Sequence, residues 1–454
     1  MKKLLVLTAF ITGLSVQAQT DETATIKSIY THALTKQQGY EWLRKLTGMG
    51  GRLAGSDEAT EAVKAFQKVA DSLGFTTQLQ EVTVPHWVRG PKEAAYYTLN
   101  GQRYEVAVRA LGGSIATPAE GLTAEVVEIT SFEQLDTMTD ELEGRIAFYN
   151  MPMDPAFINT FFAYGSAVKQ RYVGALEASK KGAVGVVARS LSSSINPYPH
   201  TGSMTYAGAD QQIPACAIST LHAEQLSRDL KANPKLEFFM QMAPRELDSV
   251  VSYNLVAEIK GSEKPEEVIV IGGHIDSWDL GTGAHDDGAG CMHSLDAVWL
   301  LKELDLLPKR TLRVVFFMNE EFGLNGAKVY AQRSKEEGID HVIAMESDAG
   351  GFTPRGISMV APDSIITRIR KLRDYLEPYG VHEFSETGAG ADISQLKSDD
   401  LVMIGLRPDS HRYFEVHHSS QDVLAQVNAR ELELGSATLA ALIYLLDKYD
   451  IVAL

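Results

Sequence analysis

The amino-acid sequence predicts an α/β fold in which a mixed, mostly parallel sheet lies between layers of helices. After residue 254, short apolar runs of strand length alternate with longer stretches of helical period. This alternation is typical of a largely parallel sheet with both faces covered. Residue types that bind metals also follow several of the apolar runs, and open α/β folds place their sites at this carboxyl edge.

The C-terminal half contains most of the predicted elements. The predicted strands are residues 254–259, 268–271, 312–317, 342–345 and 401–406. The predicted helices are residues 289–304, 326–337, 363–376 and 429–448. Their regular alternation indicates that the strands share one sheet and that the helices cover it.

The N-terminal part adds a helix and a strand to this sheet domain. Residues 56–73 place apolar side chains on one face at helical spacing. Ser56 can cap the start of this helix, and Gly74 can end it. Residues 75–84 alternate and carry β-branched side chains, which favours a strand.

The middle of the chain has a different pattern and predicts a separate, smaller domain. Short apolar runs lie between Gly and Pro at residues 124–129, 145–149, 184–187 and 215–218, with a helix at 172–181 and a long exposed loop at 190–206. We therefore predict an inserted domain over residues 110–246, and a main domain made of residues 19–109 and 247–454. The alternative is that these strands join the main sheet, because sequential strands are often neighbours.

Length and charge limit the kinds of protein and partner. A chain of 454 residues exceeds what a single hydrophobic core usually holds, which favours two domains. The net charge of −17 argues against nucleic acid and anionic membranes as partners. Cys216 and Cys291 fall in different predicted domains, so we interpret both as buried apolar residues; a disulfide is the alternative.

The first 18 residues are typical of a secretory signal peptide. Lys2 and Lys3 precede an apolar run, and a small-residue cleavage site ends at Ala18. An uncleaved anchor is the alternative, but the run is too short to span a bilayer comfortably. We expect cleavage near Ala18, export to the periplasm or the extracellular space, and no membrane anchor.

The residues that carry the chemistry begin in the stretch 268–290. A short apolar strand ends in two glycines, and His274 and Asp276 follow directly. Asp286 and Asp287 come next, just before a long apolar helix. This order places candidate ligands at the carboxyl edge of the sheet. The alternative is a polar loop whose carboxylates cap the helix.

Three further clusters lie beyond strands or in loops of the same half. They are Asn319-Glu320-Glu321, Glu346-Ser347-Asp348 and the run from His417 to Asp422. Taken singly, each is most simply a solvated acidic surface, because Asp and Glu are mostly exposed. A parallel sheet brings strand ends together, and mixed histidine and carboxylate ligands suit zinc.

The spacing within these clusters has a chemical use. One of the adjacent residues Glu320 and Glu321 can bind a metal while the other acts as general base toward the attacking water. Asp286 can bridge two metals, because a carboxylate has two oxygens. Asp276 can accept the second ring N–H of His274, which orients the imidazole.

In the order H-x-D, D-D-G, E-E, E-S-D and H-[ST]-x-x-D, the sequence resembles the co-catalytic zinc exopeptidases related to bacterial aminopeptidase S. The segments GGHIDSWD, DDGAG, NEEFGLNGA, ESDAGG and HHSSQD resemble the carboxypeptidase Q branch of this family. The middle segment resembles a protease-associated domain. The resemblance runs from about residue 20 to the end of the chain.

The resemblance implies two zinc ions and a role for each residue. His274 and Asp348 would bind one zinc, Glu321 and His418 the other, with Asp286 bridging. Glu320 would be the general base, and Asp276 would support His274. His418 is preferred to His417 because the family's ligand lies four residues before an Asp, here Asp422. Substrate contacts are expected from Gly390, Asp392 and His417, and a cis peptide bond is expected between Asp286 and Asp287.

The implied activity is hydrolysis of dipeptides or short peptides with free termini. The nearest alternative is an aminopeptidase that acts on longer peptides with a more open site. Glutaminyl cyclase chemistry uses a related fold with a single zinc, which the five implied ligands argue against. A non-catalytic binding module would be expected to lose ligands or the base, and neither is lost. Whether the chain forms a homodimer stays open.

Overall fold

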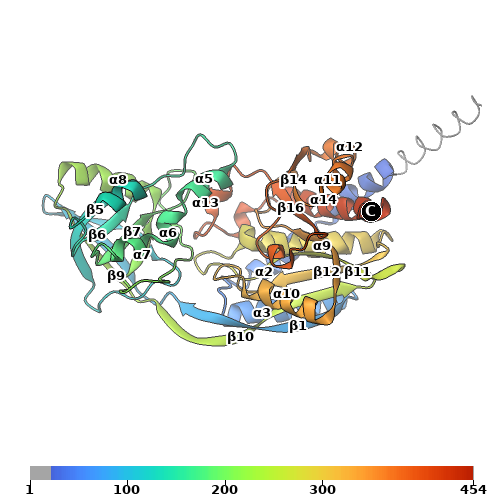
Figure 1. Ribbon diagram of the computed structural model, residues 1–454, viewed down its shortest axis with the longest axis horizontal. Helices are drawn as coiled ribbons and strands as arrows, with labels where there is room; N and C mark the ends of the chain where they lie inside the picture. The colour runs from blue at the N-terminus through green and yellow to red at the C-terminus, as the bar shows by residue number, and fades with distance from the viewer. Residues whose placement is uncertain (1–21, 453–454) are drawn as a thin grey trace, which may run out of the picture.

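Two mixed eight-stranded sheets form the framework of the molecule, and the computed structural model describes residues 22–452. In Figure 1 the two sheets lie in separate lobes, with the larger lobe on the right and the smaller on the left. The long antiparallel strands β1 (Thr76–Val88) and β10 (Arg245–Ile259) run from the larger lobe toward the smaller one.

The larger sheet has four parallel and three antiparallel strand pairs. Its strands are, in order across the sheet, β1, β10, β12 (Arg310–Phe317), β11 (Lys264–His274), β13 (Asp340–Glu346), β16 (Val402–Pro408), β14 (Pro354–Val360) and β15 (Glu383–Ser385). The predicted fold class, a mixed and mostly parallel sheet between helices, is confirmed.

Helices cover both faces of this sheet. One face packs on α2 (Gln38–Thr47), α3 (Asp57–Ser72), α9 (Ala289–Glu303), α11 (Asp363–Arg370) and α14 (Ala429–Lys448). The opposite face packs on α10 (Asn325–Glu337) and the short helix η3 (Ile393–Leu396). Alternate residues of the central strands point to the two cores: Ile269 and Ile271 to the first, Val270 to the second.

The predicted helices and strands of this lobe are present, with two differences. Ser56 caps α3 by accepting a hydrogen bond from the Ala59 N–H, as the sequence indicated. The predicted helix 363–376 is interrupted, so that α11 is followed by the separate turn α12 (Arg373–Leu376). Strands β14 and β15 were not predicted, because β14 begins with Pro354 and contains a glycine, which are turn signals in a sequence.

The smaller sheet begins earlier in the chain than residue 110. Its strands are, in order, β3 (Gln102–Val106), β2 (Glu93–Leu99), β9 (Glu237–Met242), β5 (Leu122–Ile129), β6 (Ile146–Tyr149), β7 (Gly185–Arg189), β8 (Ala215–Ile218) and β4 (Val108–Ala110). The strands over residues 93–110 pair with β9 and β8 rather than with the larger sheet. Strand pattern alone does not reveal which sheet a strand joins.

Short helices pack around the smaller sheet. They are α4 (Phe132–Thr137), α6 (Lys169–Tyr172), α7 (Gly174–Ser179) and α8 (Thr220–Ala232). Helix α5 (Thr160–Ala167) instead packs against Phe352, Tyr413 and Phe414 of the larger lobe. The predicted helix 172–181 is divided between α6 and α7. The loop 190–206 is irregular, as predicted, but it is exposed only in part: Ser190, His200 and Thr201 are buried, whereas Ile195 and Tyr198 are exposed. This loop packs against the end of the larger lobe.

The predictions on cysteines and targeting have different outcomes. Cys216 and Cys291 are both free and buried, in β8 and α9. The predicted signal peptide, residues 1–18, lies outside the described residues. Among residues 22–452, no helix has both the length and the apolar composition needed to cross a membrane.

A buried pair of carboxyl groups predicts how stability depends on pH. Asp296 on α9 and Glu433 on α14 are both 0% exposed. Burial raises the pKa of Asp296 to about 6, and burial with the Asp296 charge raises the pKa of Glu433 to about 9. The folded state therefore holds these protons more tightly than the unfolded chain. Stability is complete below the unfolded pKa values and is lost as the pH rises through the folded ones.

We therefore expect Glu433→Gln to make the decrease of the melting temperature between pH about 5 and about 9 shallower than in the wild type. Each proton contributes up to about 1.4 kcal/mol per pH unit. Melting curves across this range measure the effect, with Glu337→Gln at an exposed end of α10 as the control. Parallel curves for wild type and Glu433→Gln would contradict the assignment.

Candidate metal centre

Three adjacent parallel strands bring the first candidate residues together. β11 lies between β12 and β13, with His274 paired to Phe317 and Gly272 paired to Glu346. The three strands therefore end at the same edge. The loops that follow them carry Glu320 and Glu321 after β12 and Asp348 after β13.

Asp286 and His418 complete the group from two other segments. Asp286 precedes α9, and His418 follows the short helix α13 (Tyr413–Val416). His274 Nε2 lies 3.3 Å from Asp286 Oδ1 and 3.7 Å from Asp348 Oδ1. His418 Nε2 lies 3.1 Å from both Asp286 Oδ2 and Glu321 Oε2. The two oxygens of Asp286 thus face two different histidines, which is the arrangement a bridging carboxylate requires.

The donor atoms fit zinc. Imidazole nitrogens and carboxylate oxygens are its usual ligands, and sets that include His274, Asp286 and Glu321 converge to within 4.8 Å of one another. Glu321 Oε1 is buried without a hydrogen-bond donor among the described residues, and Asp286 Oδ2 is buried with only histidine nitrogens beside it. Buried carboxylate oxygens are costly unless a proton or a cation compensates them. The group is therefore suited to hold divalent metal ions.

The pKa shifts of this group also indicate a site for cations. Burial alone would raise the pKa of Asp286, yet contacts with His274 and His418 hold it well below its usual range. Burial would lower the pKa of His418, but Glu321 and Asp286 raise it to about 10. The carboxylates therefore attract cations strongly, and a metal ion would displace the imidazole protons as it bound.

Glu320 has the setting of a general base. It lies beside the ligand group and lines the same pocket. Burial raises the pKa of Glu320 well above its usual range, and the charges of Asp348 and Glu321 raise it further despite the opposing effect of His274. A raised pKa makes a carboxylate a stronger base, which suits a group that takes a proton from water.

Asp276 supports the site in a different way from the one predicted. The ring Nδ1 of His274 donates to the backbone carbonyl of Asp276 at 3.0 Å, whereas the carboxylate lies 3.8 Å away. That carboxylate instead accepts the backbone N–H groups of Asn319 and Glu320 at 2.7 and 3.1 Å. The turn after β11 directs the side chain toward the end of β12, so Asp276 holds the segment that carries Glu320.

Two aspartates fix the turn that presents Asp286. Asp422 accepts the N–H groups of His285 and Asp286, at 2.7 and 3.1 Å. Asp287 accepts the N–H groups of His274 and Gly290, which occupies both of its oxygens within the protein. The peptide bond between Asp286 and Asp287 is cis, as the resemblance implied.

The smaller lobe holds the segment with His418. The Thr201 N–H donates to the His418 carbonyl at 2.9 Å, and His200 Nδ1 donates to the His417 carbonyl at 2.6 Å. His418 Nδ1 lies 3.2 Å from the Thr201 carbonyl, which can accept its proton and leave Nε2 for a metal. His418 has a φ of 58°, a conformation that these neighbours stabilise. His417 stacks on His418 at 3.6 Å and lies farther from Asp286.

Two supporting residues were not predicted from the sequence. Arg52 is fully buried and donates to the carbonyls of Ile275, Thr282 and Gly283, so it holds the ligand loop from behind. Trp278 Nε1 donates to Glu321 Oε2 at 2.6 Å. Trp278 lies within the segment GGHIDSWD that carries the resemblance, whereas a lone arginine such as Arg52 has no pattern of its own.

Of the predicted substrate contacts, Gly390 lines a second pocket together with Asp348, one of the candidate ligands. Glu346 accepts the N–H groups of Ala391 and Ile393, and a Cβ on Gly390 would lie 2.3 Å from the Glu346 carboxyl carbon. Gly390 is therefore needed for close packing. Asp392 is 1% exposed, and burial raises its pKa well above the usual range. In this structure Asp392 does not line the pocket that contains Glu320, whereas His417 does.

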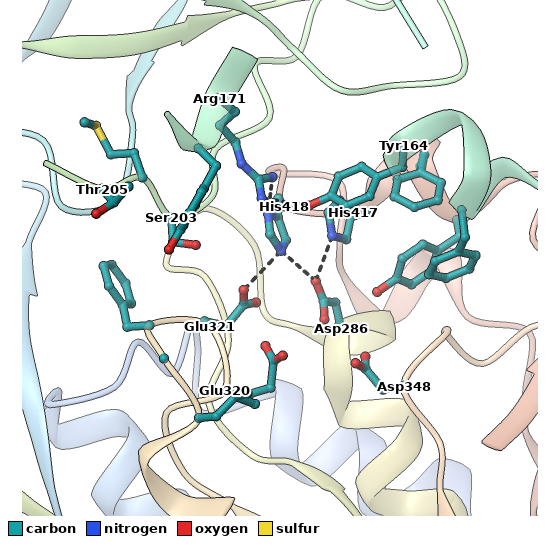
Figure 2. Close-up of a pocket in the computed structure, with 18 residues that line it drawn as sticks. Tyr164, Arg171, Ser203, Thr205, Asp286, Glu320, Glu321, Asp348, His417 and His418 are labelled. Carbon is teal, nitrogen blue, oxygen red and sulfur yellow. Dashed lines mark hydrogen bonds and ion pairs between the residues drawn. The ribbon is translucent and has the colours of Figure 1, made fainter. Parts of the chain in front are cut away.

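A pocket of about 580 Å³ opens onto this group between the two lobes. Figure 2 shows Glu320, Glu321, Asp286 and Asp348 below, and residues of the smaller lobe above. The lining residues of the smaller lobe are Phe161, Tyr164, Arg171, Tyr172, Ser203, Met204 and Thr205. A buried set of metal-binding side chains, with a carboxylic acid free beside it, defines a metal-dependent hydrolase.

Comparison with known proteins places the chain in one family. Residues 254–443 match the model of peptidase family M28. Carboxypeptidase Q from Bos taurus is 34% identical over 426 residues, which cover 93% of this chain and 88% of that protein. Carboxypeptidase Q from Homo sapiens is also 34% identical, with the same coverage. The chain therefore belongs to peptidase family M28 and is a zinc-dependent exopeptidase.

Solved structures agree with this assignment. The peptidase M28 precursor from Shewanella amazonensis SB2B superimposes with a TM-score of 0.88 at 34% identity, over 94% of this chain and 96% of that one. BSAP, a zinc aminopeptidase from Bacillus subtilis, superimposes with a TM-score of 0.64 at 18% identity, over 89% of this chain and 94% of that one. The second likeness concerns the fold alone.

Proposed function

We propose that this protein is a di-zinc exopeptidase that hydrolyses dipeptides or short peptides with both termini free. The observation that supports it most is the pocket between the lobes, where one wall carries the ligand group and Glu320 and the other belongs to the smaller lobe. A pocket with two such walls has room for a short peptide, and it limits how far a chain can extend at either end.

The ligands divide into two sets that share Asp286. His274 and Asp348 would hold one zinc, and Glu321 and His418 would hold the other. The contacts of both histidines with opposite oxygens of Asp286 support this division. When bound, zinc supplies Lewis-acid chemistry that polarises a carbonyl and lowers the pKa of water to about 7.

The side chains of the protein then perform the proton transfers. Glu320 takes the proton of the attacking water and passes it to the amine that leaves. Asp276 keeps Glu320 in place through the backbone N–H of that residue. Asp422 and Arg52 hold the loop that carries Asp286, so the ligands keep their arrangement while the substrate is exchanged.

The proposed location is outside the cytoplasm, in the periplasm or the extracellular space. The support is the pattern of residues 1–18, with cleavage near Ala18. The smaller lobe, proposed as an inserted domain, would then act as a fixed wall of the site. The reach of the smaller lobe to His418, through Thr201, supports that role.

The alternative activity is that of an aminopeptidase on longer peptides. The two proposals differ in the groups they require on the substrate. We expect a free dipeptide to be hydrolysed with a kcat/KM at least tenfold above that of its N-acetyl form and of its C-terminal amide. A blocked end would leave a buried protein group without a partner, which costs about 1–3 kcal/mol.

The measurement is kcat/KM for neutral dipeptides such as leucyl-alanine, each compared with its N-acetyl and amide forms. Equal hydrolysis of the amide and the free acid would favour the aminopeptidase and contradict the preference for free dipeptides.

A further inference from the structure

We infer that Arg171 of the smaller lobe binds the C-terminal carboxylate of the substrate. The inference rests on the proposed function, and it assigns one of the two ends of the substrate to a named side chain. Arg171 lies in α6 and is 7% exposed. It is the only Lys or Arg among the described residues that line the pocket.

Arg171 differs from the other buried arginines of residues 22–452 in its partners. Arg89, Arg189 and Arg310 each form ion pairs with carboxylates. Arg52 has no carboxylate partner, but it donates to backbone carbonyls on all sides and lies away from the pocket. Arg171 alone combines a buried guanidinium, a position on the pocket wall and no ion pair.

The neighbours of Arg171 orient its guanidinium but do not neutralise it. Nη2 donates to the Tyr164 hydroxyl at 2.7 Å, and Nη1 lies 3.4 Å from the Thr201 carbonyl. Nε has no hydrogen-bond partner. Gly202 packs directly against the group, since a Cβ there would lie 2.3 Å from Nη1. A guanidinium that is held in place and keeps unused donors is suited to a carboxylate, which it can bind through two parallel hydrogen bonds.

The distance from the metal ligands to the Arg171 guanidinium is about the length of one amino-acid residue of a substrate. Its Nη1 lies 3.3 Å from Nδ1 of His418, and Nε2 of the same ring lies 3.1 Å from Asp286. The guanidinium is therefore one imidazole ring away from the metal ligands, as Figure 2 shows. In a dipeptide, the carboxylate lies one residue, at most about 3.6 Å, beyond the scissile bond. A tripeptide would move this carboxylate out of reach.

The pocket is also charged in the way a free dipeptide requires. Its larger-lobe wall carries Asp286, Glu320, Glu321 and Asp348, and the positive charge of Arg171 lies on the opposite wall. Zinc would offset the carboxylates but not Arg171. The guanidinium is then left as the group that an anionic end of the substrate neutralises.

The test compares a free dipeptide with its C-terminal amide in wild type, Arg171→Gln and Arg171→Lys. Leucyl-alanine and leucyl-alaninamide undergo the same bond cleavage, so any disturbance of His418 affects both substrates equally. In Arg171→Gln we expect the acid-to-amide ratio of kcat/KM to fall by about 10- to 100-fold, because a hydrogen bond between charged groups is lost. The fall should come from a lower kcat/KM for the free dipeptide, mainly through a higher KM, and not from the amide. Arg171→Lys should retain part of the ratio.

The matched control is Lys169→Gln, which removes the same charge two residues away, where Lys169 lies over the Phe132 ring. It should leave the ratio unchanged, and zinc content and melting temperature should be measured for every variant. If the wild type prefers the free dipeptide and Arg171→Gln leaves the acid-to-amide ratio unchanged, the role of Arg171 is overturned and the proposed function is not. Equal loss on both substrates would assign it to positioning His418. A wild type without preference would overturn the proposed function as well.

Discussion

Glu320→Gln is expected to lower kcat by about 10²- to 10⁴-fold while the protein keeps its zinc, because the change removes proton transfer and no metal ligand. The side chain keeps its size, and its backbone N–H still donates to Asp276. The measurements are kcat on a free dipeptide and zinc content per chain. The dependence of kcat on pH should also lose the change that comes from ionisation of Glu320.

The neighbouring residue supplies the control for this prediction. Glu321 contacts His418 Nε2 at 3.1 Å and accepts from Trp278, so it belongs to the ligand set. Glu321→Gln should therefore weaken metal binding as well as activity, and added zinc should restore part of the activity. If Glu320→Gln loses zinc and Glu321→Gln retains it, the roles of the two residues are exchanged.

Removal of the metal should have a comparably large effect. Exhaustive chelation is expected to reduce kcat/KM by at least about a thousandfold, since Lewis-acid stabilisation of the transition state amounts to several kcal/mol. Chelation should also lower the melting temperature, because the buried carboxylates of Asp286 and Glu321 lose their compensating charge. Activity assays and melting curves before and after chelation, then after zinc is restored, measure both effects.

Two outcomes of chelation would argue against the metal centre. Full activity in a chelated protein whose metal content has been shown to be negligible would exclude zinc from the reaction. An unchanged melting temperature would mean that the buried carboxylates are compensated by protons alone. Magnesium in place of zinc is the control for non-specific effects of a divalent cation, because magnesium is poorly suited to histidine ligands.

Local pattern in the sequence was sufficient to predict the candidate ligands that follow strands, whereas the choice of His418 over His417 came from the resemblance. His274 ends an apolar strand, and Glu321 and Asp348 each follow another strand of the same parallel group. When parallel strands are adjacent, the residues that follow them must meet at one edge. Their proximity is a property of the fold.

The residues that support the site could not be predicted in the same way. Arg52, Arg171 and Thr201 are single residues in segments without a chemical pattern, and each acts on a partner more than 200 positions away. Only the folded chain reveals such contacts. The loop 190–206 illustrates the same limit: its Ser and Pro content indicates exposure, yet its backbone pairs with the segment that carries His418.

The difference at Asp276 has a more local cause. A spacing of two residues allows either the carboxylate or the backbone carbonyl of Asp276 to meet the His274 ring, and sequence does not distinguish them. The turn after β11 places the carbonyl there, at 3.0 Å. This leaves the carboxylate free to hold the segment of Glu320, which makes Asp276 important for the base and for the ligand alike.

The arrangement proposed for the metal centre is that Asp286 bridges two zinc ions held by four further ligands. Its most direct test is the zinc content of the enzyme, measured by elemental analysis after purification without chelator and equilibration with zinc. Two zinc ions per chain are expected in the wild type. A single tightly held zinc per chain, or none, would contradict it.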